Sequence, residues 1–361
     1  MVTPPAAESP WLPPVLATVL AVLTLLPAGY AGAARAQTAL ERWDWDPAIR
    51  VAGEPVTFPS HSPFTPADVG DGPRDDPPEE AVGMLFLPPE ASADAPVPAV
   101  IMLHGASGVI ARRELVYGRQ LAAMGVAALV VDAFGARRDM AQGFTNRLIR
   151  ITESMLVADA YAALRHLSRR PDIDRTRIAL VGFSYGGMAA TYALYREVAE
   201  RFAPDGPRFA GHVAFYAPCL ARFADPRTTG APMLMLWGAG DEITDQRRCT
   251  EIAQELRAGG SEVKQIVYPD AVHQWDGSIV GPRRIGRTLS ECDFTVREDG
   301  TVRDNNTGLI MRGPFSRRII LAFCVGREGY LIGRDDRVRE RSNRDLGHFL
   351  ARVFNRIASA D

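Results

Sequence analysis

The stretch at residues 177–188 constrains the fold of this chain most, because it reads as a buried strand that turns at once into a helix. The short apolar run at 178–181 is typical of a parallel strand covered on both faces. Gly182 and Gly186 flank Ser184, and so sharp a turn leaves no room for Cβ atoms at those two positions. The pattern G-x-S-x-G therefore predicts a strained serine whose hydroxyl projects out of the sheet.

An acid and a base follow Ser184 in the order that a nucleophilic serine on such a turn requires. Asp241 comes after the apolar run at 233–237, where backbone amides at a strand end can hold an ionised carboxylate. Of the six histidines, only His273 lies in a loop just past a predicted strand (263–268) and downstream of both residues. The sequence thus predicts a triad of Ser184, His273 and Asp241 for nucleophilic catalysis.

Two other carboxylates compete with Asp241 for the acid role. Glu242 is its neighbour in the chain, and Asp132 also ends a predicted strand, at 126–131. The position of Asp132 before the serine argues against it. A purely structural turn at Asp241 is a further alternative.

Three motifs together resemble those of the dienelactone hydrolase family within the α/β-hydrolases. They are Gly182-Phe-Ser184-Tyr-Gly-Gly187, Gly240-Asp241 and Tyr268-Pro-Asp-Ala-Val-His273, and the similarity spans residues 81–273 plus the last helix. The resemblance implies an α/β-hydrolase fold, in which helices flank a mostly parallel central sheet, and the same triad. Dienelactone hydrolases have a cysteine where this chain has Ser184, so we expect a broader serine esterase acting on small-molecule esters or lactones.

The loop at 104–108 follows a predicted strand at 100–103 and occupies the place of the second oxyanion donor in α/β-hydrolases. The amide of Ala106 is the candidate donor there, and the amide of Tyr185, at a helix N-terminus, is the first. A plain tight turn is the alternative for this loop. We expect His104 to brace the loop rather than to take part in chemistry.

The remaining pattern predicts one long helix at 148–169, a closing helix at 344–358, and a late insertion between sheet and closing helix at 277–343. The insertion contains a hairpin around 298–300 and a strand-like run at 318–324. It is polar and rich in arginine, which disfavours an apolar lid.

Arg137 and Arg138 lie in a loop after the strand that ends at Asp132. Either guanidinium could hold a carboxylate of a substrate, although solvated surface arginines are commoner.

The first residues resemble an export signal. Residues 12–27 are almost wholly apolar, and an A-x-A pattern at 34–36 suits cleavage before Gln37. The usual positive charge is missing, since residues 1–10 contain neither Lys nor Arg, so a true start elsewhere and a retained anchor stay open. We expect a signal peptide (1–36), an irregular lead (37–80) with a candidate strand at 55–58, a hydrolase domain (81–361), and a periplasmic or secreted location.

Four cysteines lie downstream of the predicted cleavage site, and an even number in an exported chain suggests two disulfides. Three pairings are possible. Cys219 with Cys249 is favoured, because each follows one of two neighbouring strands, which leaves Cys292 and Cys324 to close the insertion. Buried free thiols are the alternative.

Composition excludes several other classes. The net charge of −2 over 361 residues gives no electrostatic argument for nucleic acid, and a membrane partner requires the N-terminal segment to be retained. The triad needs neither metal nor organic cofactor, and no His/Cys cluster has zinc spacing. A serine peptidase, a lipase or an acyltransferase on the same fold, and a non-catalytic binding protein, are the rival functions.

Overall fold

The computed structural model describes residue 1 and residues 36–70, 79–243 and 245–358. The signal peptide predicted over residues 1–36 therefore lies almost entirely outside the described residues. Within the part of the chain that is described, no helix is both long and apolar enough to span a bilayer.

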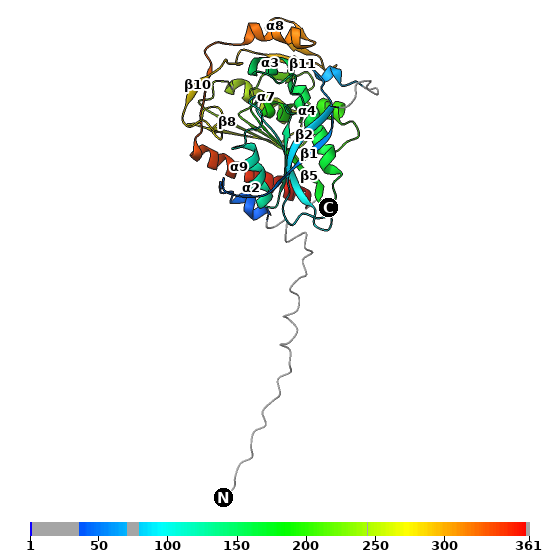
Figure 1. The fold of residues 1–361 in the computed structure, drawn as a ribbon, viewed down its shortest axis with the longest axis vertical. Helices are drawn as coiled ribbons and strands as arrows, with labels where there is room; N and C mark the ends of the chain where they lie inside the picture. Colours follow the sequence, from blue (N-terminus) through cyan, green and yellow to red (C-terminus); the bar gives the residue numbers. More distant parts are fainter. Residues whose placement is uncertain (2–35, 71–78, 244, 359–361) are drawn as a thin grey trace.

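Eight strands form the central sheet: β1 (Gly53–Ser60), β2 (Glu79–Phe86), β3 (Val97–Leu103), β4 (Ala127–Asp132), β5 (Ile173–Phe183), β6 (Gly211–Phe215), β8 (Met233–Gly238) and β9 (Val263–Tyr268). Their spatial order is β1-β2-β4-β3-β5-β6-β8-β9 (Figure 1). β2 pairs antiparallel with β1 and with β4, whereas the other neighbouring strands are parallel. This confirms the predicted α/β fold with a mostly parallel sheet.

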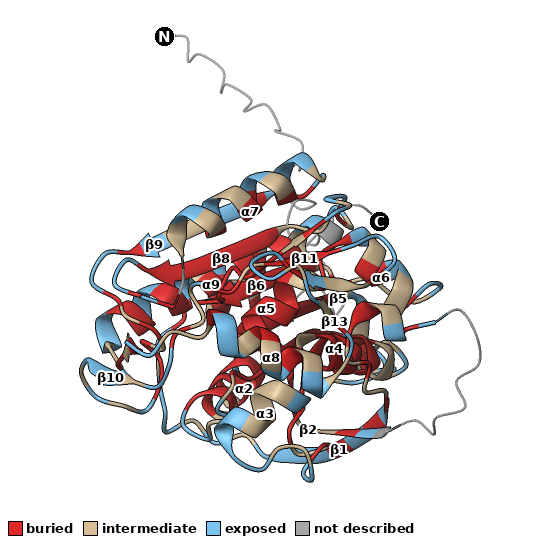
Figure 2. Cartoon of the chain, turned by 90° about the horizontal axis from the view of Figure 1, so that it is seen from above, coloured by how far each residue is buried: buried red, intermediate tan, exposed pale blue. Residues whose placement is uncertain are grey.

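Helices cover both faces of this sheet, so that the strands are buried between two layers (Figure 2). One face carries α4 (Glu153–Ser168), α5 (Tyr185–Tyr192), α6 (Arg196–Phe202) and α7 (Gln246–Ala258), and the other carries α2 (Glu114–Ala123) and α9 (Asp336–Ala358). β3 is buried along its whole length, with Ile101 and Leu103 in one core and Val100 and Met102 in the other. Burial on both faces explains why this strand is apolar throughout rather than alternating.

The long helix predicted at 148–169 is wrong, because two helices occupy this region. α3 (Phe144–Arg150) ends before Ile151, and α4 begins after Thr152, both of which have extended backbone. The Thr152 hydroxyl donates to the carbonyl of Pro63, and acidic Glu153 opens the next helix. An extended threonine followed by an acidic residue is a helix start signal.

The lead at 37–80, expected to be irregular, contributes the edge strand of the sheet. β1 alternates, with Val56, Phe58 and Ser60 buried and the residues between them exposed. The candidate strand at 55–58 is thus part of β1, whose two prolines, Pro55 and Pro59, are tolerated because one side of the strand has no partner.

The insertion builds two small sheets beside the central one. β11 (Phe294–Val296), β12 (Val302–Asp304) and β13 (Ile310–Met311) form one sheet with β7 (Ala221–Phe223), in the order β13-β12-β11-β7. β10 (Arg283–Ile285) pairs with β14 (Tyr330–Ile332). β11 and β12 are antiparallel around the predicted hairpin turn, which confirms the hairpin. The closing helix α9 begins earlier than predicted, at Asp336.

The strand predicted at 318–324 is wrong, because this run belongs to helix α8 (Pro314–Cys324). Arg317, Ile320 and Cys324 are its buried residues, at the spacing of one helix face. Pro314 occupies the first turn, and the Ser316 hydroxyl accepts the amide of Gly313.

Two disulfides link segments distant in the chain, and they are the favoured pairing. Cys219 bonds to Cys249 of α7, and Cys292 bonds to Cys324 at the end of α8. Two disulfides fit folding in an oxidising compartment.

Candidate active site

Ser184 lies at the turn between β5 and α5, as the glycine pattern predicts. Its backbone has φ 51° and ψ −110°, a left-handed conformation that a serine adopts only under strain. A Cβ at Gly182 would lie 2.0 Å from the carbonyl oxygen of Gly186, and one at Gly186 would lie 2.4 Å from that of Leu103. Both flanking positions therefore require glycine.

The three residues of the predicted triad form one hydrogen-bonded line. The Oγ of Ser184 lies 2.9 Å from Nε2 of His273, and Nδ1 of His273 lies 2.8 Å from Oδ2 of Asp241. Because a carboxylate only accepts, Nδ1–H donates to Asp241 and Nε2 accepts the serine hydroxyl. Among these residues Ser184 has the largest exposed fraction, 7%, so the line is shielded from water yet open at its serine end.

Asp241 is fixed by the turn that follows β8. Its Oδ1 accepts the amide of Ile243 at 3.1 Å. The rival Glu242 is instead half exposed and forms an ion pair with Arg284 at 2.8 Å. That hydrogen bond lowers the pKa of Glu242 below its ordinary value.

Asp132, the other rival acid, lies elsewhere at the sheet edge. Its Oδ1 accepts the amide of Gly135 and lies 3.7 Å from Nε2 of His104. Neither rival contacts His273 in the manner of Asp241.

The loop of His273 is held by the insertion. The amide of His273 donates to the carbonyl of Leu331 in β14, and its carbonyl accepts the amide of Gly333 just after β14. The imidazole lies between the rings of Tyr216 and Tyr330, with centroids 4.9 and 5.2 Å away. Burial raises the pKa of Tyr330 to about 12, so this wall of the imidazole is neutral. Sequence reasoning missed both tyrosines, because they lie outside the motifs.

A buried polar network supports Tyr216 from behind. Its hydroxyl donates to Asp276 at 2.5 Å and accepts from Arg113 at 3.2 Å. Arg113 also forms an ion pair with Glu114, whose carboxylate accepts the amide of Ile110. Burial raises the pKa of Asp276. The network connects the loop before α2 with the loop that carries His273.

The loop predicted to supply an oxyanion donor lies against Ser184. A Cβ at Gly105 would lie 3.3 Å from the Cβ of Ser184. The carbonyl of Ala106 accepts from Arg147 of α3 at 3.0 Å, which fixes the orientation of the Ala106–Ser107 peptide. His104 is fully buried with Nδ1 2.8 Å from the carbonyl of Gly105, and burial lowers its pKa. His104 therefore supports this loop from its buried side.

Arg137 and Arg138 do not reach the serine. The guanidinium of Arg137 is buried and pairs with Asp159 of α4 at 2.6 Å, so it stabilises the core instead. Arg138 is exposed and does not line the cavity at Ser184. The sequence left open that Arg137 holds a substrate carboxylate, but its carboxylate partner is Asp159, on a helix that sequence spacing could not place beside it.

A cavity of about 430 Å³ opens at Ser184. Ala106 and Tyr185 line it beside the serine, and most of its remaining wall is apolar. α3 and α8 supply much of that wall, with Leu148 on the first helix and Leu321 on the second. The insertion therefore gives the site an apolar wall, contrary to what its arginine-rich sequence suggested.

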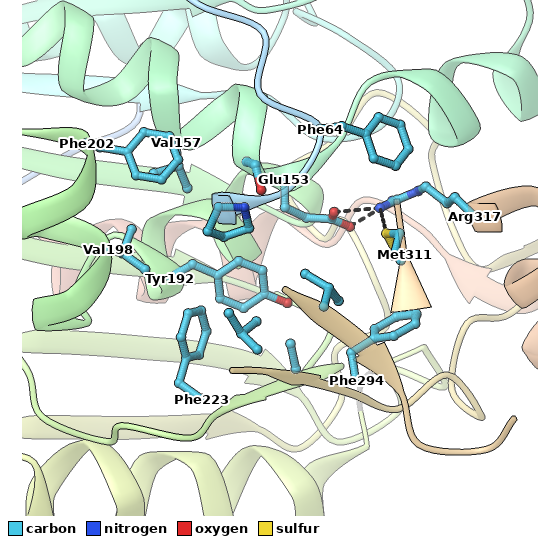
Figure 3. A pocket seen from close by; sticks show the side chains of 15 residues that line it. Phe64, Glu153, Val157, Tyr192, Val198, Phe202, Phe223, Phe294, Met311 and Arg317 are labelled. Carbon is cyan, nitrogen blue, oxygen red and sulfur yellow. Dashed lines mark hydrogen bonds and ion pairs between the residues drawn. The ribbon is translucent and has the colours of Figure 1, made fainter. Parts of the chain in front are cut away.

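A second, smaller cavity of about 40 Å³ lies beneath α8 and does not include Ser184 (Figure 3). At its edge Arg317 of α8 forms an ion pair with Glu153 of α4 at 2.9 Å. The same guanidinium donates to the carbonyl of Leu148 and to the hydroxyl of Tyr185. These contacts attach α8 to the residue that follows the serine.

The family model of the dienelactone hydrolases matches residues 83–276, more than half of the chain. The chain belongs to the dienelactone hydrolase family. The resemblance found in the sequence is thereby confirmed, and the matched segment includes Ser184, Asp241 and His273. In this member of the dienelactone hydrolase family, α8 and β14 lie beyond the matched segment.

Individual relatives are distant. The dipeptidyl aminopeptidase BIII of Pseudoxanthomonas mexicana is 26% identical over 53% of this chain, and the match spans only 33% of that protein's length. A protein of Escherichia coli provisionally named carboxymethylenebutenolidase is 26% identical over 51% of this chain and 69% of its own. A crystal structure from Klebsiella pneumoniae, provisionally named a dienelactone hydrolase, has 22% identity and a TM-score of 0.43, covering 62% of this chain and 88% of that one.

Proposed function

We propose that this member of the dienelactone hydrolase family cleaves carboxylic esters or lactones through an acyl-enzyme on Ser184. His273 accepts the serine proton as the hydroxyl attacks the ester carbonyl, and Asp241 holds the imidazole and stabilises its charged form. His273 then returns the proton to the leaving alcohol. Water attacks the acyl-enzyme by the same route and releases the acid.

The observation that carries the proposal is the unbroken hydrogen-bonded line from Ser184 through His273 to Asp241. The strained backbone of Ser184 supports it, since strain of this kind is retained where function requires it. We assign the oxyanion to the amides of Tyr185 and Ala106, because both residues line the cavity beside the serine.

Labelling with an organophosphonate tests the nucleophile. The reagent should modify Ser184, and Ser184→Ala should lose labelling together with at least ~10³-fold in turnover of p-nitrophenyl acetate. Ser278→Ala is the matched control, because Ser278 is exposed and lies away from the cavity. Modification at another residue, or full activity of Ser184→Ala, would overturn the proposal.

A peptidase is the second candidate, because a relative matched over half of this chain is a dipeptidyl aminopeptidase. Comparison of an ester with the matching anilide separates the two activities. We expect hydrolysis of p-nitrophenyl esters and no release of p-nitroaniline from aminoacyl anilides. Preferred cleavage of the anilide would favour the peptidase.

We further propose that the chain is exported to the periplasm or beyond. The two disulfides support this location, and the pattern before Gln37 supplies the signal. N-terminal sequencing of the mature protein should begin at Gln37, and recovery of the intact N-terminus from the cytosol would contradict export.

A further inference from the structure

We infer that the site is selective for esters with an uncharged apolar group of medium length, and that α8 sets the upper limit of that length. The inference rests on the proposed function, because it concerns the group that fills the cavity during attack by Ser184. It adds a substrate class and the residues that select it.

The shape of the cavity is the first argument. Its volume of about 430 Å³ lies within the range of sites that enclose a small ligand. Ser184 and the two proposed oxyanion residues line one part of it, so a bound ester places its carbonyl there. The cavity therefore has room for one group considerably larger than acetyl.

The lining is the second argument. Leu148 and Ile149 of α3, Leu321 and Ala322 of α8, and Val325 just after α8 line the cavity. Burial of an apolar chain against such side chains gains about 0.8 kcal/mol for each methylene, which is roughly a fourfold increase in kcat/KM if the gain is kept in the transition state.

The two arginine residues at the cavity are compatible with an uncharged, apolar substrate group. Arg287 and Arg318 also line the cavity, but both residues are exposed. A long side chain in this position keeps its guanidinium in water while its methylene groups cover apolar surface.

The rigidity of the wall is the third argument. Arg317 attaches one end of α8 to Glu153, as Figure 3 shows, and the Cys324 disulfide attaches the other end to Cys292. Figure 1 shows α8 as the outermost helix above α3. Because both ends are held, the wall cannot retreat from a long chain, and Ala322 lies where added bulk would shorten the space.

A chain-length series provides the first test. For p-nitrophenyl esters, kcat/KM should rise roughly fourfold per methylene from acetate, reach a maximum between butyrate and octanoate, and then fall. A series of alkyl acetates tests the alcohol side in the same way. If both series are flat or decline from their shortest member, the inference is overturned.

Substitution on α8 provides the second test. Ala322→Trp should lower the ratio of hexanoate to acetate hydrolysis at least tenfold, and Leu321→Ala should move the maximum to a longer chain. Phe323→Trp is the matched control, because Phe323 is the next residue on the same helix, is also exposed, and does not line the cavity. The ratio of hexanoate to acetate hydrolysis by Phe323→Trp should equal that of the unmodified protein.

Labelling of Ser184 by a small fluorophosphonate separates the possible failures. Normal labelling of Ala322→Trp with an unchanged hexanoate-to-acetate ratio overturns the inference and leaves the proposed function standing. Absence of both labelling and ester hydrolysis in the unmodified protein overturns both. Normal labelling with the expected loss of hexanoate hydrolysis supports the assignment of α8.

Discussion

At the scale of single residues, the carboxylates of Asp241 and Glu242 follow each other in the turn after β8 but lie in opposite environments. Asp241 is buried against the imidazole, with its second oxygen on the Ile243 amide. Glu242, the next residue, points to solvent and pairs with Arg284. The two environments differ because consecutive side chains of a turn point to different sides of the backbone.

Asp241→Asn should therefore lower kcat by about 10⁴-fold, because the amide no longer fixes the imidazole tautomer in which Nε2 accepts the serine proton. The measurement is the rate of p-nitrophenyl acetate hydrolysis at saturating substrate. Glu242→Gln, the matched control, should stay within about twofold, as expected for an exposed ion pair. Equal losses in the two variants would contradict the assignment of the acid.

The triad could be predicted because each member follows a strand and the three occur in a fixed order along the chain. Arg137 could not be placed, because its partner Asp159 lies on α4 and only the packed helix brings the two together. Tyr330 was missed for the same reason, since the insertion brings it against His273.

At the scale of elements, α8 shows how tertiary contacts override local propensity. The run Ile319-Ile320-Leu321 favours a strand by composition. Buried Arg317, Ile320 and Cys324 nevertheless lie on one helical face, and Arg317 has a carboxylate partner in Glu153. No sequence window contains both partners, so the helix could not be predicted locally.

Arg317→Met should lower the free energy of unfolding by about 3 kcal/mol, because it leaves the carboxylate of Glu153, whose side chain is only 16% exposed, without its ionic partner. Replacing both residues by methionine should recover most of that loss, since an apolar pair has no charge to desolvate. Urea denaturation measures both effects. A double variant as unstable as the single one would show that the ion pair is not the cause.

β6 places a histidine in the core. His212 is buried with Nδ1 2.9 Å from the carbonyl of Ala190, and burial lowers its pKa to about 4. The unfolded chain binds a proton near pH 6.5, so the folded state loses about 1.4 kcal/mol per pH unit as pH falls from about 6.5 toward about 4.

His212→Gln keeps a donor for the Ala190 carbonyl but cannot titrate. Its free energy of unfolding should therefore depend less on pH between about 4 and 6.5 than that of the unmodified protein. Unfolding at a series of pH values measures the slope, and the value at pH 8 removes any constant cost of the substitution. Identical slopes would rule out His212 as the source.

At the scale of the whole molecule, one disulfide joins helix α7 to the segment after β6, and the other joins two parts of the insertion. They close loops of similar length, with sequence separations of 30 and 32 residues. The late insertion was predicted from the gap between His273 and the closing helix. Its apolar inner wall was not, because the exposed arginines dominate its sequence.

Replacing either cysteine pair by alanine should lower the free energy of unfolding by about 3–4 kcal/mol, because loops of this size lose similar entropy on closure. The two double variants serve as controls for each other, and thermal unfolding without reductant compares them. A large stability difference between them would indicate that native-state packing, rather than loop closure, dominates one of the two bonds.

The attachment of α8 at both ends also bears on how the rate responds to poorly soluble esters. An esterase with a mobile lid shows an abrupt rise in rate when the surface of an oil droplet displaces that lid. α8 is held by Arg317 and by Cys324, so it is not free to move in this way. With tributyrin, the rate should follow a simple hyperbola and level off at the solubility limit, without a lag or a jump when emulsion forms.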